Sequence, residues 1–434
     1  MRLSRKEKLI GKIGQDGTVQ QFKKLYGSTQ DVISSQTERY IELVSNFDRA
    51  FQESTDCGPV SIFSTPGRTE VGGNHTDHNA GKVLAAAINM DIIAAVSKNE
   101  LHEIVIESDG FEKITVNLND LTVHENEKNT SAALVRGVCA RFKELGYEIG
   151  GFDAAVMSSV PEGAGLSSSA AFEVQIATII DHLYNGNTIS PVQRAQIAQY
   201  AENVYFGKPC GLMDQATCSS GSFVTIDFKD ADNPDVKKIE YDFGSSGYSL
   251  AIINTGSSHA DLTDEYAAVK NEMIEVANAF GGELLRSFSK EKVLENVAFL
   301  REKTSDRAIL RALHFYADNQ RVDEEVIALE QNNFSEFMRL VIESGYSSWM
   351  MNQNCYTTKA PQEQSVPVAL SVSESILKGN GAWRIQGGGF AGTMQAFVPH
   401  ELKAVYFTQM SEIFGPNSCY DLSIRSEGSI KLDI

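Results

Sequence analysis

The chain has 434 residues, of which 42% are hydrophobic, so it is long enough to bury more than one hydrophobic core, and we expect two domains. Its formal net charge of -19 disfavours nucleic acids and anionic membrane surfaces as partners and fits a small-molecule substrate better. The six cysteines are scattered and form no CxxC pair, which predicts free thiols in a reducing compartment.

The amino terminus is basic but has no apolar stretch of the kind that a secretory signal needs. The most apolar run, residues 83–96, is interrupted by Asn89 and Asp91, which argues against a membrane-spanning segment. We therefore expect a cytoplasmic protein.

Helices are predicted up to residue 51, because apolar side chains recur there at helical spacing. From residue 60 the pattern changes to short apolar or alternating runs separated by Gly, Asn and Asp, which predicts β-strands. A helix, a strand at residues 152–160 and a further helix follow, so this part reads as an α+β lobe.

Residues 190–209 predict one more helix, with Ser190 as its N-cap and Gly207 near its end. After a strand at residues 222–228, the polar, turn-rich segment 228–238 is the expected domain boundary. We expect lobes at residues 1–228 and 229–434, the second also of the α+β class.

A run of small residues, Val160-Pro161-Glu162-Gly163-Ala164-Gly165-Leu166-Ser167-Ser168-Ser169, lies between a predicted strand and an apolar helix. Small residues let a phosphate approach the backbone, and the helix amino terminus offers free N–H groups. It lacks the G-K-[ST] ending of a Walker A loop. A simple turn with a serine N-cap is the alternative, but three consecutive serines favour phosphate binding because a cap needs only one.

A second glycine run, GGGFAG at residues 387–392, lies between two predicted strands. It could be a flexible hairpin, or it could form a second wall of the same binding site, opposite the serine loop.

Residues 68–79, RTEVGGNHTDHN, combine one arginine, two histidines, an aspartate and two asparagines in a loop after a strand. Such groups suit the recognition of a polyhydroxyl compound, whose hydroxyls both donate and accept hydrogen bonds. A metal site at His75, Asp77 and His78 and a plain solvated loop are the alternatives.

Asp214 follows the Ser190 helix in the segment CGLMDQ, where a carboxylate in an apolar turn is costly unless it has a role. It could accept a proton from a substrate hydroxyl, pair electrostatically with Arg68, or cap a helix that begins near Gln215.

In this order, four segments resemble those of galactokinases, which belong to a superfamily that also contains homoserine, mevalonate and phosphomevalonate kinases. The segments are TPGRTEVGGNHTDH, VPEGAGLSSSAAFEV, AENVYFGKPCGLMDQ and GGGFAG. The resemblance implies an ATP- and Mg²⁺-dependent kinase that phosphorylates galactose at its anomeric hydroxyl. It also implies a two-lobed α+β fold, with a first lobe like domain 2 of ribosomal protein S5, a ferredoxin-like second lobe, and the active site between them.

The resemblance also implies roles for individual residues. Asp214 matches the catalytic aspartate, and Arg68 matches its cationic partner, which also stabilises charge on the transferred phosphoryl group. Ser168 and Glu202 match the magnesium-binding serine and glutamate. The other matches are the nucleotide-binding residues Gly163, Gly165, Ser167, Ser168 and Ser169, and the sugar-binding residues Asn74, His75, Asp77, Gly211 and Tyr266.

Three positions of the sugar loop depart from the family pattern: Glu70 replaces Asn, Asn74 replaces Glu, and His78 replaces Tyr. The family glutamate at the Asn74 position contacts the sugar at C6, so Asn74 is expected to relax recognition there. Kinases of galacturonate or N-acetylgalactosamine are therefore alternatives to a galactokinase. A catalytically silent sugar sensor is a third, less favoured because the serine loop, Arg68, Glu202 and Asp214 are all present.

Overall fold

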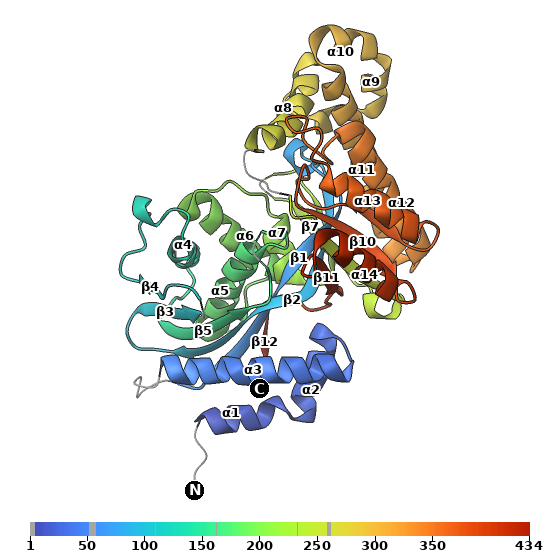
Figure 1. The fold of residues 1–434 in the computed structure, drawn as a ribbon. Helices are drawn as coiled ribbons and strands as arrows, with labels where there is room; N and C mark the ends of the chain where they lie inside the picture. Colours follow the sequence, from blue (N-terminus) through green and yellow to red (C-terminus); the bar gives the residue numbers. More distant parts are fainter. Residues whose placement is uncertain (1–4, 52–57, 109, 162, 232, 258–261) are drawn as a thin grey trace.

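The computed structural model describes residues 5–51, 58–108, 110–161, 163–231, 233–257 and 262–434. Cys57, Glu162 of the serine loop and residues 258–261, which precede Tyr266, lie outside the described residues. The chain forms an α+β structure in which three amino-terminal helices lie at one end and α8, α9 and α10 at the other (Figure 1). The expected α+β class is confirmed.

The amino-terminal helices cover one face of the larger sheet, as the helical pattern predicted. Tyr40 and Phe47 are buried against Ile62 and Ile93 of that face. The helices are α1 (Arg5–Ile13), α2 (Asp16–Tyr26) and α3 (Gln30–Ala50).

A buried carboxylate fastens these helices to the sheet. Asp91, with no exposed surface, accepts hydrogen bonds from Arg39 (2.7 Å), Tyr26 (2.6 Å) and Arg425 (3.1 Å), and also from Ser64. Burying a charge is costly unless it is paired and hydrogen-bonded. Asp91 interrupts the apolar run because it joins the amino-terminal helices to the carboxy-terminal segment.

The larger sheet contains, within the described ranges, eight strands, and β3 and β5 form its parallel pair. Its last strand comes from the carboxy terminus and pairs with β1, which no sequence pattern predicted. The strands are β1 (Ser61–Gly72), β2 (Lys82–Lys98), β3 (Glu103–Ser108), β4 (Ile114–Asn117), β5 (Phe152–Ser158), β6 (Phe223–Asp227), β7 (Asp235–Ile239) and β12 (Ile430–Leu432).

Helices also pack against the other face of this sheet, where alternate side chains such as Phe63 and Ala94 point. Ser190 caps its helix as predicted, since its hydroxyl accepts from the Gln193 amide (3.2 Å). That helix continues into a π-helical turn, Ala201–Phe206, which ends at Gly207. The helices are α4 (Ser131–Glu144), α5 (Ser168–Tyr184), α6 (Pro191–Tyr200) and α7 (Met213–Ser220).

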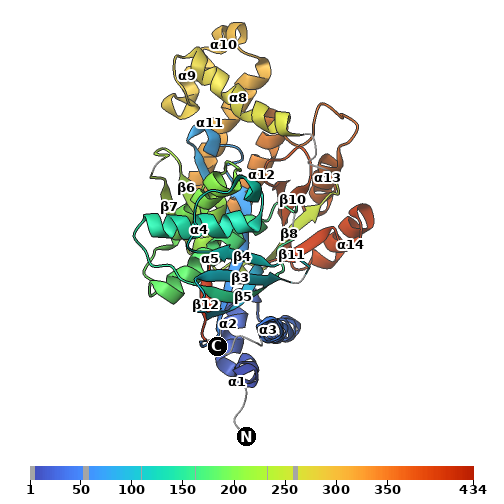
Figure 2. The ribbon, with the colours of Figure 1, turned by 90° about the vertical axis from the view of Figure 1, so that its left-hand side faces the viewer.

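The second sheet has the antiparallel order β11-β8-β10-β9, and α13 and α14 pack against one of its faces. Figure 2 shows α8, α9 and α10 extending away from both sheets. The strands are β8 (Tyr248–Asn254), β9 (Ala382–Ile385), β10 (Thr393–Pro399) and β11 (Cys419–Leu422). The helices are α8 (Thr263–Ala279), α9 (Lys290–Glu295), α10 (Val297–Lys303), α11 (Asp306–Glu330), α12 (Phe334–Ser347), α13 (Ser365–Leu377) and α14 (Lys403–Phe414).

The division of the chain at residue 228 stays a prediction. Strands β7 and β12 follow that position in the sequence but belong to the larger sheet. None of the helices in the described part of the chain combines the length and apolar character needed to cross a membrane.

Helix α11 supports the end of β1, where the polar loop begins. A Cβ added to Gly72 would overlap the carboxylate of Glu325, so the glycine allows this close approach. Glu325 has no exposed surface, and neither of its side-chain oxygens has a hydrogen-bond partner. Burial, followed by the charge of Asp318, raises the pKa of Glu325 from 4.5 to about 8.

Replacing Glu325 by Gln should therefore stabilise the protein at alkaline pH. A carboxyl group with a raised pKa destabilises the folded state progressively as pH rises from 4.5 to about 8. Glu325→Gln should raise the unfolding free energy at pH 8.5 by about 4 to 5 kcal/mol, with little change at pH 4.5.

Denaturant unfolding of both proteins at the two pH values measures this difference. Glu324→Gln is the control, because Glu324 accepts from Gln320 at an exposed position of the same helix. An equal gain for Glu325→Gln at both pH values would contradict the ionisation argument.

Candidate active site

The serine loop joins β5 to α5, between a strand and a helix as predicted. Gly163 and Gly165 have φ angles of 74° and 68°, a left-handed backbone that glycine adopts readily. Ser167 precedes the helix but makes no capping hydrogen bond. Its hydroxyl donates to the Asp214 carboxylate instead. The simple capping interpretation is therefore wrong for Ser167, whose side chain leaves the first N–H groups of α5 uncapped.

Arg68 lies on β1, which extends to Gly72, so the prediction that the loop begins at residue 68 is wrong. Arg68 joins the serine loop to Asp214. Its Nε and Nη2 atoms donate to Asp214 Oδ1 (2.7 Å) and Oδ2 (2.6 Å), and its Nη1 atom donates to the Gly165 carbonyl oxygen (2.5 Å). Such bidentate pairing fixes both orientation and charge. Gly67 allows this approach, because a Cβ there would lie 2.7 Å from the Leu166 carbonyl oxygen.

Asp214 lies in the first turn of α7 and does not cap the helix, whose N-cap position is Leu212. Burial favours a raised pKa, but the charge and hydrogen bonds of Arg68, with the hydrogen bond from Ser167, outweigh it. The pKa of Asp214 is therefore lowered from 3.8. Its side chain keeps 32% of its surface exposed, so the ionised carboxylate remains accessible.

The second glycine run forms the turn between β9 and β10. The residues on either side of it, Gln386 and Thr393, lie against Gly165 of the serine loop, which favours the second-wall interpretation. Gln386 Nε2 donates to the Gly165 carbonyl oxygen (3.1 Å). The Tyr266 hydroxyl donates to the Gly389 carbonyl oxygen (3.0 Å). A Cβ on Gly388 would lie 2.5 Å from the Tyr266 ring, so Tyr266 packs directly on this turn.

The loop after β1 reaches the same place from the other side. His75 Nε2 lies 2.8 Å from the Gly388 carbonyl oxygen, so Nε2 carries the proton and donates. Burial, followed by the charge of His78, lowers the pKa of His75 to about 4, which keeps the ring neutral near pH 7. Asp77 and Gly211 are adjacent, since a Cβ on Gly211 would lie 3.5 Å from Asp77 Oδ2.

Asn74 is enclosed by protein. Its Nδ2 atom donates to Glu70 Oε1 and to the Gly387 carbonyl oxygen, both at 2.8 Å. Its Oδ1 atom accepts from Asn354 (2.8 Å), and it has no exposed surface. Direct sugar binding by Asn74 stays a prediction, and these surroundings do not favour it. Burial raises the pKa of the neighbouring Glu70 to about 7.

Two buried carboxylates lie behind Asp214. Gln215 Nε2 donates to Glu202 Oε2 (2.8 Å) and to Glu173 Oε2 (3.4 Å), while Glu173 Oε1 has no partner. Burial, and then the charge of Glu202, raises the pKa of Glu173 well above 4.5. Glu202 also pairs with Lys208 (3.5 Å), so the oxygen without a partner is Glu173 Oε1. Such an oxygen fits a hard divalent cation such as Mg²⁺, which often takes one or two protein carboxylates.

The alternative metal site at His75, Asp77 and His78 has no structural support. Among the described residues, no group of three or more His, Cys, Asp or Glu side chains is arranged to hold a metal ion.

Sequence reasoning missed Glu173 and Gln386. Glu173 had a visible signal, because it is a carboxylate within the apolar helix after the serines. Gln386 had none, since its contact with Gly165 joins residues far apart in the chain.

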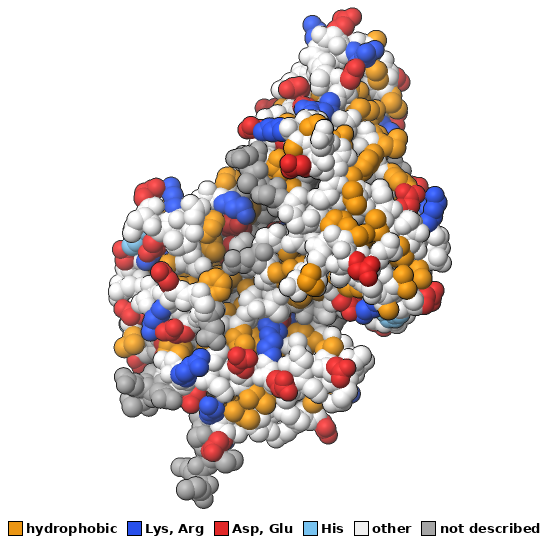
Figure 3. Space-filling model, viewed as in Figure 1, with side chains coloured by type: hydrophobic (Ala, Val, Ile, Leu, Met, Phe, Trp, Pro, Cys, Tyr) orange, Lys and Arg blue, Asp and Glu red, His pale blue; other side chains and the backbone are white. Residues whose placement is uncertain are grey.

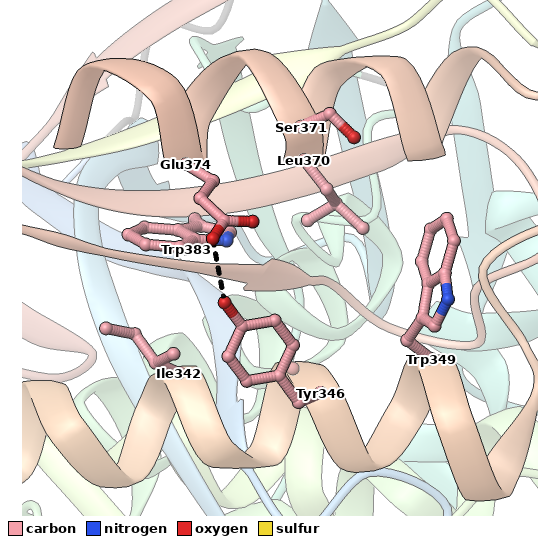
Figure 4. Close-up of a pocket in the computed structure, with 8 residues that line it drawn as sticks. Ile342, Tyr346, Trp349, Leu370, Ser371, Glu374 and Trp383 are labelled. Atoms are coloured by element: carbon pink, nitrogen blue, oxygen red, sulfur yellow. Dashed lines mark hydrogen bonds between the residues drawn. The ribbon is translucent and has the colours of Figure 1, made fainter. Parts of the chain in front are cut away.

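A separate pocket of about 220 Å³ lies between α12 and α13 (Figure 4). Both tryptophans of the chain, Trp349 and Trp383, line it, and the Tyr346 hydroxyl donates to Glu374 (3.1 Å). Hydrophobic side chains also gather on this side of the molecule (Figure 3). None of the predicted site residues lines this pocket.

Comparison with known families matches the same segments. Residues 133–222 match the GHMP kinases N terminal domain, and residues 45–98 match the galactokinase galactose-binding signature. The first match includes the serine loop and Asp214, and the second includes Arg68 and the loop after β1.

Individual relatives cover most of the chain. A galactokinase of Actinobacillus pleuropneumoniae is 32% identical over 81% of this chain and 88% of its own length. The Homo sapiens galactokinase is 30% identical over 89% of this chain and 96% of its own length. The Lactococcus lactis galactokinase structure, complexed with galactose, matches the fold with a TM-score of 0.74 at 23% identity, covering 92% of this chain and all of its own. The chain therefore belongs to the galactokinase family.

Proposed function

We propose that the protein transfers the γ-phosphoryl group of ATP to the anomeric hydroxyl of galactose. The main observation in support of this proposal is the bidentate contact between Arg68 and Asp214. The contact lies between the serine loop and the loop after β1, which is the proposed sugar-binding loop. Galactokinases that share about 30% identity over most of the chain support it.

In the proposed mechanism, Asp214 accepts a hydrogen bond from the anomeric hydroxyl and takes its proton as the bond to phosphorus forms. A carboxylate whose pKa is lowered is a weak base, so the proton moves late. Phosphoryl transfer passes through a loose transition state that demands little prior activation of the nucleophile, which suits such a base. Arg68 holds Asp214 in position and offsets the negative charge on the transferred phosphoryl group.

The remaining roles are those that the resemblance to galactokinases implies. The free N–H groups at the start of α5, with Gly163, Gly165 and the serines at 167–169, would contact the nucleotide phosphates. Ser168 and Glu202 would hold the magnesium ion. When bound, that ion would neutralise charge on the phosphate oxygens. His75, Asp77, Gly211 and Tyr266 would contact the sugar.

We also propose a cytoplasmic location, which the free thiols of Cys139, Cys210, Cys218, Cys355 and Cys419 support.

The direct test of this function is a substrate panel of galactose, galacturonate, N-acetylgalactosamine and glucose with ATP and Mg²⁺. Release of ADP gives kcat/KM, and ³¹P NMR identifies a phosphate on the anomeric carbon. Galactose should have the highest kcat/KM. A preference for galacturonate or N-acetylgalactosamine would replace galactose as the substrate, and no turnover of any sugar would favour a sensor.

Asp214→Asn should nearly abolish turnover, by roughly 10²- to 10⁴-fold in kcat, because an amide neither accepts the proton nor neutralises Arg68. ADP release measures the loss, and ATP binding should change little. Thermal unfolding checks that the variant is folded at the assay temperature, because the buried Arg68 loses its charge partner. The matched control is Asp264→Asn, whose carboxylate forms an exposed ion pair with Lys359. Turnover of Asp214→Asn within a few fold of wild type would refute the catalytic assignment.

Glu202→Gln should raise the Mg²⁺ concentration for half-maximal activity about 5-fold or more, with a smaller effect on the sugar KM. Mn²⁺ binding to the nucleotide complex, followed by electron paramagnetic resonance, gives a second readout that does not depend on turnover. Glu125→Gln is the control, since Glu125 pairs with Lys128 at the surface. An unchanged metal titration would favour a purely structural Glu202.

A further inference from the structure

The carboxylate of Glu70 lies beside the proposed catalytic pair. Between Arg68 and Glu70, β1 pairs regularly with β2, through Arg68 with Ala87 and Glu70 with Ala85. Residues two apart on a strand point to the same face, so Glu70 shares a face with Arg68. Thr69 points the other way, where it contacts Gln395 (3.1 Å).

The two oxygens of Glu70 have different surroundings. Oε1 accepts from Asn74 Nδ2 (2.8 Å) and from Arg384 Nη2 (3.1 Å). Oε2 makes no hydrogen bond within the described part of the chain. The side chain keeps 9% of its surface exposed, and Oε2 is not among the fully buried atoms that lack a partner. One oxygen is thus fixed by the protein, and the other can accept from a ligand.

The Asn74 side chain, in contrast, has no hydrogen-bonding position left for a ligand. Both of its amide donor positions are used, and its Oδ1 faces three donors, from Asn354, Ser348 (3.3 Å) and Asn352 (3.4 Å). A glutamate here would bring a second carboxylate against Glu70 and the Gly387 carbonyl oxygen. The site accommodates one carboxylate and one amide, and in this chain the carboxylate lies on β1.

We propose that Glu70 determines sugar specificity by accepting a hydrogen bond from one sugar hydroxyl through Oε2, and that Asn74 is a positioning residue that orients Glu70. This inference rests on the proposed sugar kinase function. It also reverses the expectation for position 74. Above about pH 7, where Glu70 is ionised, the negative charge absent at position 74 is present at Glu70, where it would repel a uronic acid carboxylate and favour galactose.

The test compares wild type with Glu70→Gln at pH 8.5, using galactose and its 2-, 3-, 4- and 6-deoxy analogues. Gln keeps an acceptor for Asn74 and Arg384, so the loop should stay folded. The variant should lose about 10- to 100-fold in kcat/KM for galactose, chiefly through KM. For one deoxy analogue, which lacks the recognised hydroxyl, the variant and wild type should differ little.

A merely structural role would lower kcat/KM for every analogue by the same factor, and that result would overturn the inference. The exchange variant Glu70→Asn/Asn74→Glu provides a second test, because it moves the single carboxylate to position 74. It should recover more activity than either single substitution, whereas additive losses would contradict a shared carboxylate–amide pair.

Wild-type turnover separates the two hypotheses. If wild type phosphorylates none of the sugars, the proposed function fails and this inference fails with it. If wild type is active on galactose but Glu70→Gln discriminates among the analogues as wild type does, only the role of Glu70 is refuted.

Discussion

The ion pair between Arg68 and Asp214 is the interaction on which the rest of the site depends. Arg68 is almost completely buried, and removing its partner would leave a charge with little access to water. The same guanidinium contacts Gly165, so the pair fixes β1, the serine loop and α7 relative to one another. Three segments that are distant in sequence thereby form one surface, which is where we propose that the phosphate and the sugar hydroxyl bind.

A second buried polar network ties the sugar loop to the carboxy-terminal half of the chain. The backbone N–H of Asn74 donates to Asp318 (2.8 Å), and the backbone carbonyl oxygen of Asn74 accepts from His314 (2.8 Å). Asp318 and His314 both lie on α11. His75 contacts the β9–β10 turn. Since buried polar groups are costly when unpaired, each of these contacts restricts the position of the loop. The predicted sugar site therefore depends on residues from both halves of the chain.

The sequence predicted the features that local patterns encode. The early helices and strands follow from hydrophobic period, the Ser190 helix from its cap, and the serine loop from its small residues before an apolar helix. It did not predict that Ser167 contacts Asp214, that Asn74 is enclosed, or that β12 pairs with β1. Those features are side-chain contacts or strand pairings between distant segments, for which no local period exists. Glu70 shows the difference most clearly, because sequence comparison marked it as unusual but only its contacts suggest a role.

A crystal structure with galactose and a non-hydrolysable ATP analogue would show directly whether Asp214 faces the reacting hydroxyl. We expect the anomeric oxygen to lie about 3 Å from the Asp214 carboxylate, with the γ-phosphate against the serine loop and in line with that oxygen. A sugar bound with its anomeric carbon directed away from Asp214, or a nucleotide bound outside the serine loop, would contradict this expectation.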